Sequence, residues 1–167
     1  EVEAAIRWAA AHEGPVYIRL SRMPVPALDI PDRIFIPGKA TLARPGHDLT
    51  IIACGTITHL AMTAAKELAT EGIEARVLNM HTINPLDEEA IDAAAQTGAI
   101  VTAEEAHLRG GLGGAVAEYT ASHRPVPVER LGFDGFQPTG DLAHLFERSG
   151  LTVAGIKAAA RRAVARK

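Results

Sequence analysis

Residues 49–54 (LTIIAC) form a nearly unbroken apolar run that is shorter than an ordinary helix. Such runs are typical of strands covered on both faces, as in parallel sheets. After a turn at Gly55-Thr56, apolar residues return at the spacing of one helical face, at Ile57, Leu60, Ala61, Ala64, Ala65 and Leu68. A buried strand followed by an amphipathic helix is the repeating unit of an α/β sheet.

The same alternation continues to the end of the chain. We predict further strands at 75–80, at 100–101 and at 125–131, each followed by a helix. The expected N-caps of three helices are Asn84, with Pro85 at the first helical position, Thr139 and Thr152. These elements predict a three-layer α/β fold: a mostly parallel sheet with helices on both faces, and one antiparallel edge strand at 40–43.

The stretch 100–119 (IVTAEEAHLRGGLGGAVAEY) combines a strand, a charged elbow and a helix that begins with four glycines. The strand is expected to stop at Glu104 and Glu105, and Leu112 opens the helical face. Glycines permit positive φ and close approach of another backbone or a ligand. The elbow would lie at the carboxyl edge of the sheet, where α/β proteins collect ligands and partners.

The first part of the chain differs in character. Residues 1–13 read as an amphipathic helix that begins mid-pattern, and 16–20 (VYIRL) read as a strand followed by Ser21-Arg22. Prolines crowd the next segment, at Pro24, Pro26, Pro31 and Pro37, which excludes helix there. We expect residues 1–23 to be the end of a preceding domain, 24–38 a semi-rigid linker, and 39–167 a domain of their own.

Composition narrows the function classes. The net charge of −3 argues against a general nucleic-acid binder. The single cysteine, Cys54, lies in an apolar run, which offers no disulfide framework and is consistent with a cytoplasmic protein. No apolar run reaches the ~18–20 residues that a membrane span needs.

Residue chemistry alone leaves the function open. The glycines match neither the G-x-G-x-x-G nor the G-x-x-x-x-G-K-[ST] spacing of nucleotide-binding loops. Close packing of the glycines on another chain or domain is therefore favoured over a bound nucleotide. Glu104, Glu105 and His107 lack a second His or Cys at the spacing of metal ligands, which disfavours a transition-metal site. These three side chains could relay protons, but a salt-bridged interface is favoured. Arg22, at the end of a predicted strand, could bind a phosphate or carboxylate through two parallel hydrogen bonds.

The chain resembles the transketolase superfamily along essentially its whole length. Residues 16–22 (VYIRLSR) are similar to the end of the pyrimidine-binding domain. Residues 81–91 (HTINPLDEEAI), 102–105 (TAEE) and 110–118 (GGLGGAVAE) are similar to the C-terminal domain, in order and with the expected spacing. The split transketolases, whose second subunit carries these two domains, are the most similar.

The resemblance implies transfer of a two-carbon ketol unit between sugar phosphates, with thiamine diphosphate and a divalent metal (Mg) in the full enzyme, and a place in the pentose phosphate pathway. It implies that the other domains or subunit are partners, in a homodimer or heterotetramer. Neither the motif that binds the diphosphate and the metal nor the activating glutamate of the pyrimidine-binding domain is expected in this chain. The fragment alone should therefore bind no cofactor and be inactive. The resemblance makes Arg22 a substrate-phosphate ligand, with Arg19 as a second candidate; no catalytic, cofactor or metal residue is expected.

One departure concerns the elbow. Relatives often have Glu-Glu-His, whereas here Ala106 intervenes and the histidine is His107, so no role is transferred to it. The elbow, with Glu104, Glu105, Gly110, Gly111 and Gly113, is expected to pack on a neighbouring protomer. Two alternatives stay open: the β subunit of a 2-oxo acid dehydrogenase, and a non-catalytic α/β regulatory or interaction module.

Overall fold

A computed structural model describes residues 1–28, 30 and 34–167. Its centre is a five-stranded sheet with the order β1-β3-β2-β4-β5. The strands are β1 (Thr41–Arg44), β2 (Leu49–Ala53), β3 (Ala75–Asn79), β4 (Ile100–His107) and β5 (Val128–Phe133). All neighbours pair in parallel except β1, which runs antiparallel to β3 at one edge. The predicted α/β class and its antiparallel edge strand are confirmed.

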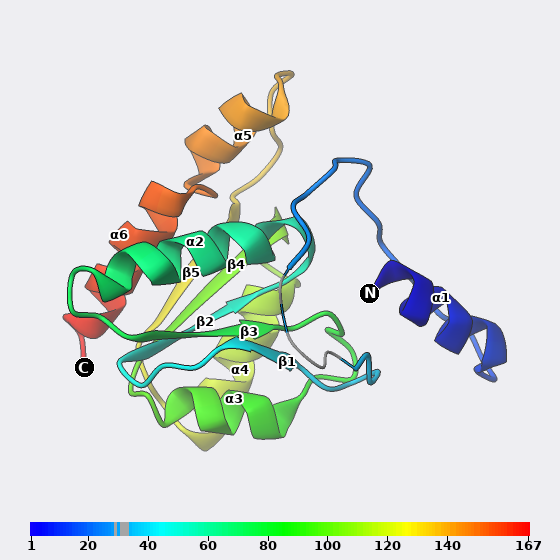
Figure 1. Ribbon diagram of the computed structural model, residues 1–167, viewed down its shortest axis with the longest axis horizontal. Helices are drawn as coiled ribbons and strands as arrows, with labels where there is room; N and C mark the ends of the chain where they lie inside the picture. The colour runs from blue at the N-terminus through cyan, green and yellow to red at the C-terminus, as the bar shows by residue number, and fades with distance from the viewer. Residues whose placement is uncertain (29, 31–33) are drawn as a thin grey trace.

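Helices cover both faces of this sheet (Figure 1). On one face, α2 (Thr58–Ala69) and α6 (Val153–Val164) pack over the strands, and on the other lie α3 (Glu88–Ala95) and α4 (Leu112–His123). A short helix, η1 (Gly55–Ile57), precedes α2, and α5 (Leu142–Ser149) precedes α6. Adjacent residues of β2 point to opposite cores: Ile51 joins the first, Ile52 the second, and both are fully buried. The apolar run of β2 therefore belongs to a strand that is covered on both faces of the sheet.

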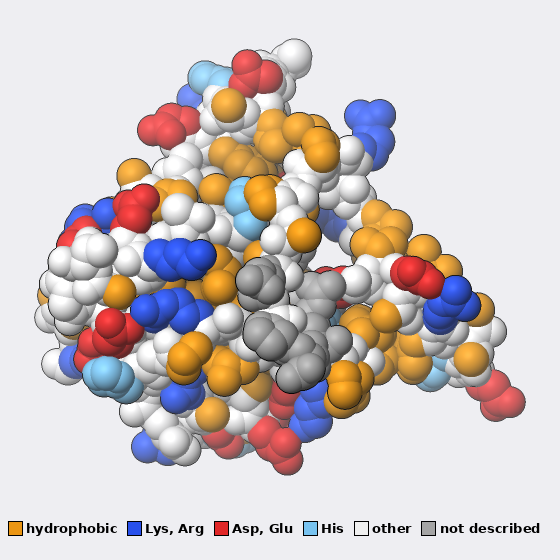
Figure 2. Space-filling view, in the orientation of Figure 1, with side chains coloured by type: hydrophobic (Ala, Val, Ile, Leu, Met, Phe, Trp, Pro, Cys, Tyr) orange, Lys and Arg blue, Asp and Glu red, His pale blue; other side chains and the backbone are white. Residues whose placement is uncertain are grey.

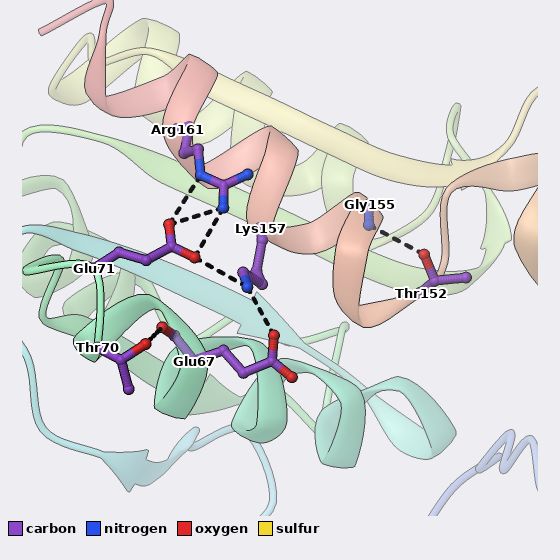
Figure 3. Close-up of polar contacts among 7 residues, drawn as sticks. All are labelled: Glu67, Thr70, Glu71, Thr152, Gly155, Lys157 and Arg161. Carbon is purple, nitrogen blue, oxygen red and sulfur yellow. Dashed lines mark hydrogen bonds and ion pairs between the residues drawn. The ribbon is translucent and has the colours of Figure 1, made fainter.

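Ion pairs, as well as apolar contacts, join α6 to its neighbours. Lys157 contacts Glu67 at 2.7 Å and Glu71 at 3.0 Å, and Arg161 also reaches Glu71 at 2.8 Å (Figure 3). The carboxylate of Glu129, in β5, pairs with two further arginines: Arg162 of α6 at 3.0 Å, and Arg166, just beyond the end of α6, at 2.7 Å. These basic side chains at the end of the chain thus pair with α2, with the turn that follows it and with β5.

Two of the three predicted caps are wrong. Asp87, not Asn84, caps α3, where its carboxylate accepts a hydrogen bond from the amide of Ala90. The same carboxylate accepts from the amide of Ala40 and pairs with Lys39, so contacts distant in sequence favour Asp87. Asp141, not Thr139, caps α5 through the amide of His144. The third prediction is confirmed, since Thr152 accepts from the amide of Gly155 in α6.

The N-terminal part forms α1 (Val2–Ala11), none of whose residues is buried, and it stands to one side of the sheet (Figure 1). The predicted strand at 16–20 is wrong: these residues are exposed and have no regular secondary structure. A strand needs a paired neighbour, and the described residues offer it none. The predicted linker 24–38 includes residues 29 and 31–33, which lie outside the described part; its other residues form neither helix nor strand.

No helix in the described part of the chain combines the length and apolar character required to cross a bilayer.

Candidate functional site at the carboxyl edge of the sheet

The carboxyl ends of β2 and β4 are the topological switch point of this fold. From β2 the chain passes through α2 to β3 on one side, whereas from β4 it passes through α4 to β5 on the other. Connections that diverge from adjacent parallel strands leave a crevice between them, where open α/β sheets bind ligands. The residues that follow β2 and those that end β4 therefore define the candidate site.

Glu104, which we expected to contact a neighbouring protomer, is fully buried within the chain. Strand β4 does not stop at the carboxylates but continues to His107, which pairs with Phe133 of β5. The side chain of Glu104 turns inward and accepts hydrogen bonds from the amides of Leu112 at 2.8 Å and Gly113 at 2.7 Å. It satisfies the free N–H groups of the first turn of α4, and the positive end of the helix favours its charge.

The glycines beside Glu104 are required within the chain itself. A Cβ on Gly111 would collide with the carboxylate of Glu104, and one on Gly113 would lie 2.7 Å from Thr102 Oγ1. Gly110 has a φ of +78°, which L side chains rarely adopt. Their contact with a neighbouring protomer stays a prediction, whereas Glu104 has no surface with which to make one.

Glu105, the next residue, lies at the switch point and is partly exposed. Its Oε2 accepts a hydrogen bond of 2.6 Å from Thr56 Oγ1, in the turn after β2. Its Oε1 lies 3.7 Å from Nη2 of Arg19, in the N-terminal segment. One carboxylate therefore connects the ends of both strands to a segment 86 positions earlier in the sequence.

A second polar contact joins the N-terminal part to the same edge. Asn79, the last residue of β3, donates a hydrogen bond of 2.6 Å to Glu1 and accepts one of 3.2 Å from Thr58. Between α1, the extended segment after it and the sheet edge lies a cleft of about 1010 Å³. Its lining includes Arg19, Ser21 and Glu105, together with apolar side chains.

Arg22 is exposed and does not line this cleft. It makes no hydrogen bond or ion pair with any residue that the structure describes, so its guanidinium is free for an anion. Ser21 is occupied locally, since its Oγ accepts a hydrogen bond of 3.1 Å from the amide of Met23. The two predicted arginines thus differ: Arg19 is bound to Glu105 and Arg22 is free.

Two other side chains have no part in this arrangement. Burial, with a smaller contribution from the Glu104 carboxylate, raises the pKa of the Cys54 thiol to about 12, so that it stays protonated. The ring of His107 faces the backbone amides of Arg109 and Gly135, at 3.1 and 3.2 Å. The structure therefore does not bring His107 together with Glu104 as a proton relay would require.

Comparison with known proteins assigns the family. A family model described as the transketolase C-terminal domain matches residues 38–156. The chain belongs to the transketolase C-terminal domain family. The sequence resemblance is confirmed, and so is the fold that it implied.

The transketolase relatives are longer than this chain. It is 47% identical over 169 residues to the 6-deoxy-6-sulfo-D-fructose transketolase subunit of Clostridium sp. (strain MSTE9), a match covering 100% of this chain and 52% of that protein. It is 44% identical over 145 residues to an apulose-4-phosphate transketolase subunit of Phocaeicola vulgatus, covering 85% and 46%. The chain spans about half the length of these curated relatives.

A solved structure extends the likeness to the N-terminal segment. A split gene transketolase, solved as an inactive beta4 tetramer, superposes with a TM-score of 0.93 at 43% identity and covers 98% of this chain and 55% of that one. The transketolase of Leishmania mexicana gives a TM-score of 0.61 at 25% identity, covering 77% and 18%. These similarities do not favour the 2-oxo acid dehydrogenase alternative.

The transketolase family depends on thiamine diphosphate, but the described residues do not fit this cofactor. No group of three or more His, Cys, Asp or Glu side chains among them could hold its divalent metal. At the switch point, the Thr56 hydroxyl that follows β2 donates to Glu105, whose negative charge would repel a diphosphate. We therefore derive no chemical step through the cofactor from this chain.

Proposed function

We propose that this chain is the C-terminal part of a thiamine diphosphate-dependent transketolase that transfers a two-carbon ketol unit between sugars bearing a terminal anion. The observation that carries the proposal is the likeness to a split gene transketolase over 98% of the chain, which includes the segment bearing Arg22. The relatives named as transketolase subunits support the same conclusion.

The proposed division of the chain is 1–23 as the end of a pyrimidine-binding domain, 24–38 as linker and 39–167 as the C-terminal domain. The match to the family model, which begins at residue 38, supports the last boundary. Hydrophobic side chains gather on the N-terminal arm, which projects from the body of the molecule (Figure 2). They include Val2, Ile6 and Trp8, which are exposed. A helix that buries nothing supports its assignment to a larger packing unit.

Arg22 is the proposed ligand for the anion of the sugar. A guanidinium can bind phosphate through two parallel hydrogen bonds, and the same fork suits a sulfonate. One relative is named for a 6-sulfo sugar and another for a sugar 4-phosphate, and each of these two sugars carries an anionic group of this kind. Because neither name belongs to a pentose phosphate pathway sugar, we propose the class of anionic sugars rather than that pathway.

The rest of the enzyme is proposed to supply the cofactor, the divalent metal and the catalytic groups. Its partners would be the remaining domains or subunit, in a homodimer or a heterotetramer, with Glu105 and Gly110 near a protomer contact. The unpaired Cys54 supports a reducing compartment, the cytoplasm.

The test is to assay the complete enzyme that contains this chain, with thiamine diphosphate and Mg²⁺, for transfer of a two-carbon unit from a ketose phosphate to an aldose phosphate. Formation of both the shortened and the lengthened sugar is expected. Acyl transfer to a lipoyl acceptor instead would support a 2-oxo acid dehydrogenase, and inactivity toward both classes would support a non-catalytic module.

A further inference from the structure

The switch point, where an α/β sheet usually accepts a ligand, holds a side chain of this protein's own N-terminal segment. Glu105 lies between Thr56, which follows β2, and Arg19. The side chain of Glu105 is only 22% exposed, whereas that of Arg19 is 56% exposed. The carboxylate is therefore the fixed member of this pair, and Arg19 is the member that it holds.

The hydrogen bond from Thr56 fixes the direction of that carboxylate. At 2.6 Å it is a short bond to a charged acceptor, and such bonds are stronger than neutral ones. It occupies Oε2 and leaves Oε1 toward Arg19. The attachment point of the N-terminal segment is thus set by the two central strands of the sheet.

Arg22 lies three residues beyond Arg19 in the same extended segment and has no such partner among the described residues. Three extended residues span at most ~10 Å, so holding Arg19 restricts the volume that Arg22 can sample. Glu105 also offsets the charge of Arg19, which leaves Arg22 as the uncompensated cation of this segment.

We infer that Glu105 is a positioning residue for substrate binding: by holding Arg19, it places Arg22 where it meets the terminal anion of the sugar. The inference rests on the proposed function, because it concerns the same anion contact. Glu105 itself touches no substrate in this account. Its contribution is to reduce the conformational freedom that Arg22 would lose on binding.

The direction in which KM for an anionic sugar changes when Glu105 is replaced separates this role from a purely electrostatic one. A carboxylate near an anion site repels the anion, so its removal should lower KM for an anionic sugar if charge alone matters. If Glu105 positions Arg22, its removal should raise KM instead. Glu105→Gln is the suitable variant because it keeps the size and an oxygen acceptor for Thr56 but removes the charge.

The experiment measures kcat and KM of the complete enzyme with a phosphorylated sugar and with an unphosphorylated sugar. For Glu105→Gln we expect KM for the phosphorylated sugar to rise about two- to fivefold, the range of a weak exposed ion pair, with kcat unchanged. KM for the unphosphorylated sugar should stay as it is. Glu129→Gln is the matched control: this carboxylate is 19% exposed and also pairs with arginines, but with Arg162 and Arg166 at the other end of the chain and not with the N-terminal segment.

A double-mutant cycle with Arg19→Gln provides the second variant, on an exposed side chain whose loss should not impair folding. If Glu105 acts through Arg19, each single variant raises KM alike and the double variant adds little. A lowered or unchanged KM in Glu105→Gln, or the same rise in Glu129→Gln, would overturn the inference. A phosphate-selective rise in Arg22→Gln alone would leave the proposed anion contact intact, whereas its absence would overturn both.

Discussion

The carboxylate of Glu104 closes the first turn of α4, where its Oε1 accepts a hydrogen bond of 2.7 Å from the amide of Gly113. Its Oε2 accepts a second from the amide of Leu112, and the side chain has no exposed surface. A buried charge is tolerated here because both oxygens have donors and the helix end is positive. This contact fixes β4 to α4, and so fixes the position of Glu105.

Replacing Glu104 by Gln should destabilise the fold. The amide retains one acceptor, so that one of the two N–H groups would face an NH₂ donor instead of an oxygen. We expect the free energy of unfolding to fall by about 1–3 kcal/mol, the usual effect of losing a buried hydrogen bond to a charged group. Urea denaturation measures this change. Glu118→Gln, on the exposed side of α4, is the control, and equal midpoints for the two variants would contradict the capping role.

The glycines of α4 allow a comparison between adjacent positions. A Cβ on Gly113 would lie 2.7 Å from Thr102 Oγ1, whereas one on Gly114 would meet nothing closer than Leu108 O at 3.8 Å. Gly113→Ala should therefore cost about 1–3 kcal/mol through overpacking. Gly114→Ala should instead be neutral or stabilise by up to ~1 kcal/mol through helix propensity.

Thermal unfolding of the two glycine variants tests this order, and a less stable Gly114→Ala would show it to be wrong. The assembly state, measured by light scattering, tests the predicted protomer contact separately. Loss of assembly by Gly113→Ala without loss of stability would assign that glycine to the interface.

Thr102 presents an unusual buried hydroxyl. Its Oγ1 is inaccessible and has no hydrogen-bond partner among the described residues. Thr102→Val keeps the branched shape and removes the unsatisfied polar group. We therefore expect the free energy of unfolding to rise by up to ~1 kcal/mol. The midpoint of chemical denaturation reports this directly. A loss of stability would mean that the hydroxyl has a partner, such as an ordered water.

The ion pairs of α6 with Glu71, in the turn after α2, should make stability depend on pH. The hydrogen bond from Arg161, and then that from Lys157, lower the pKa of Glu71 below its usual value of 4.5 (Figure 3). Their stabilisation is therefore complete above this usual value and is lost as the pH falls through the lower folded-state pKa. Glu71→Gln should lower the melting temperature at neutral pH, and the gap from the wild type should close in acid.

High salt should narrow the same gap at neutral pH, because these side chains are partly exposed and screened. Glu147→Gln, an exposed carboxylate on α5, serves as the control. A gap between wild type and Glu71→Gln that is independent of both pH and salt would attribute the effect to packing.

Periodicity was sufficient to predict the sheet and its main helices, because alternating buried strands and amphipathic helices leave few arrangements. It was not sufficient for caps: Asn84 and Asp87 are both good capping residues, and contacts with Lys39 and Ala40 favour the second. It also placed the end of β4 too early. Charged residues usually end a buried strand, but Glu104 is paired within the core by amides eight and nine positions later.

The candidate site shows a similar limit. Arg22 was a candidate from residue chemistry that the family resemblance strengthened, with Arg19 as a weaker candidate, but the sequence carries no sign of which is held and which is free. That difference depends on Glu105, which only the topology of the sheet brings to Arg19. The predicted strand at 16–20, which bears Arg19 and ends just before Arg22, was wrong for a related reason, since its side chains suit a sheet but the described residues provide no strand to pair with it.

Steady-state kinetics of Arg22→Gln in the complete enzyme tests the central claim most directly. Arg22 is exposed and has no partner among the described residues, so the variant should fold as the wild type does. We expect KM for a phosphorylated sugar to rise about tenfold or more, the equivalent of one lost charged hydrogen bond, with KM for an unphosphorylated sugar unchanged. Equal losses for both sugars, or no loss for either, would contradict the claim that Arg22 binds the terminal anion.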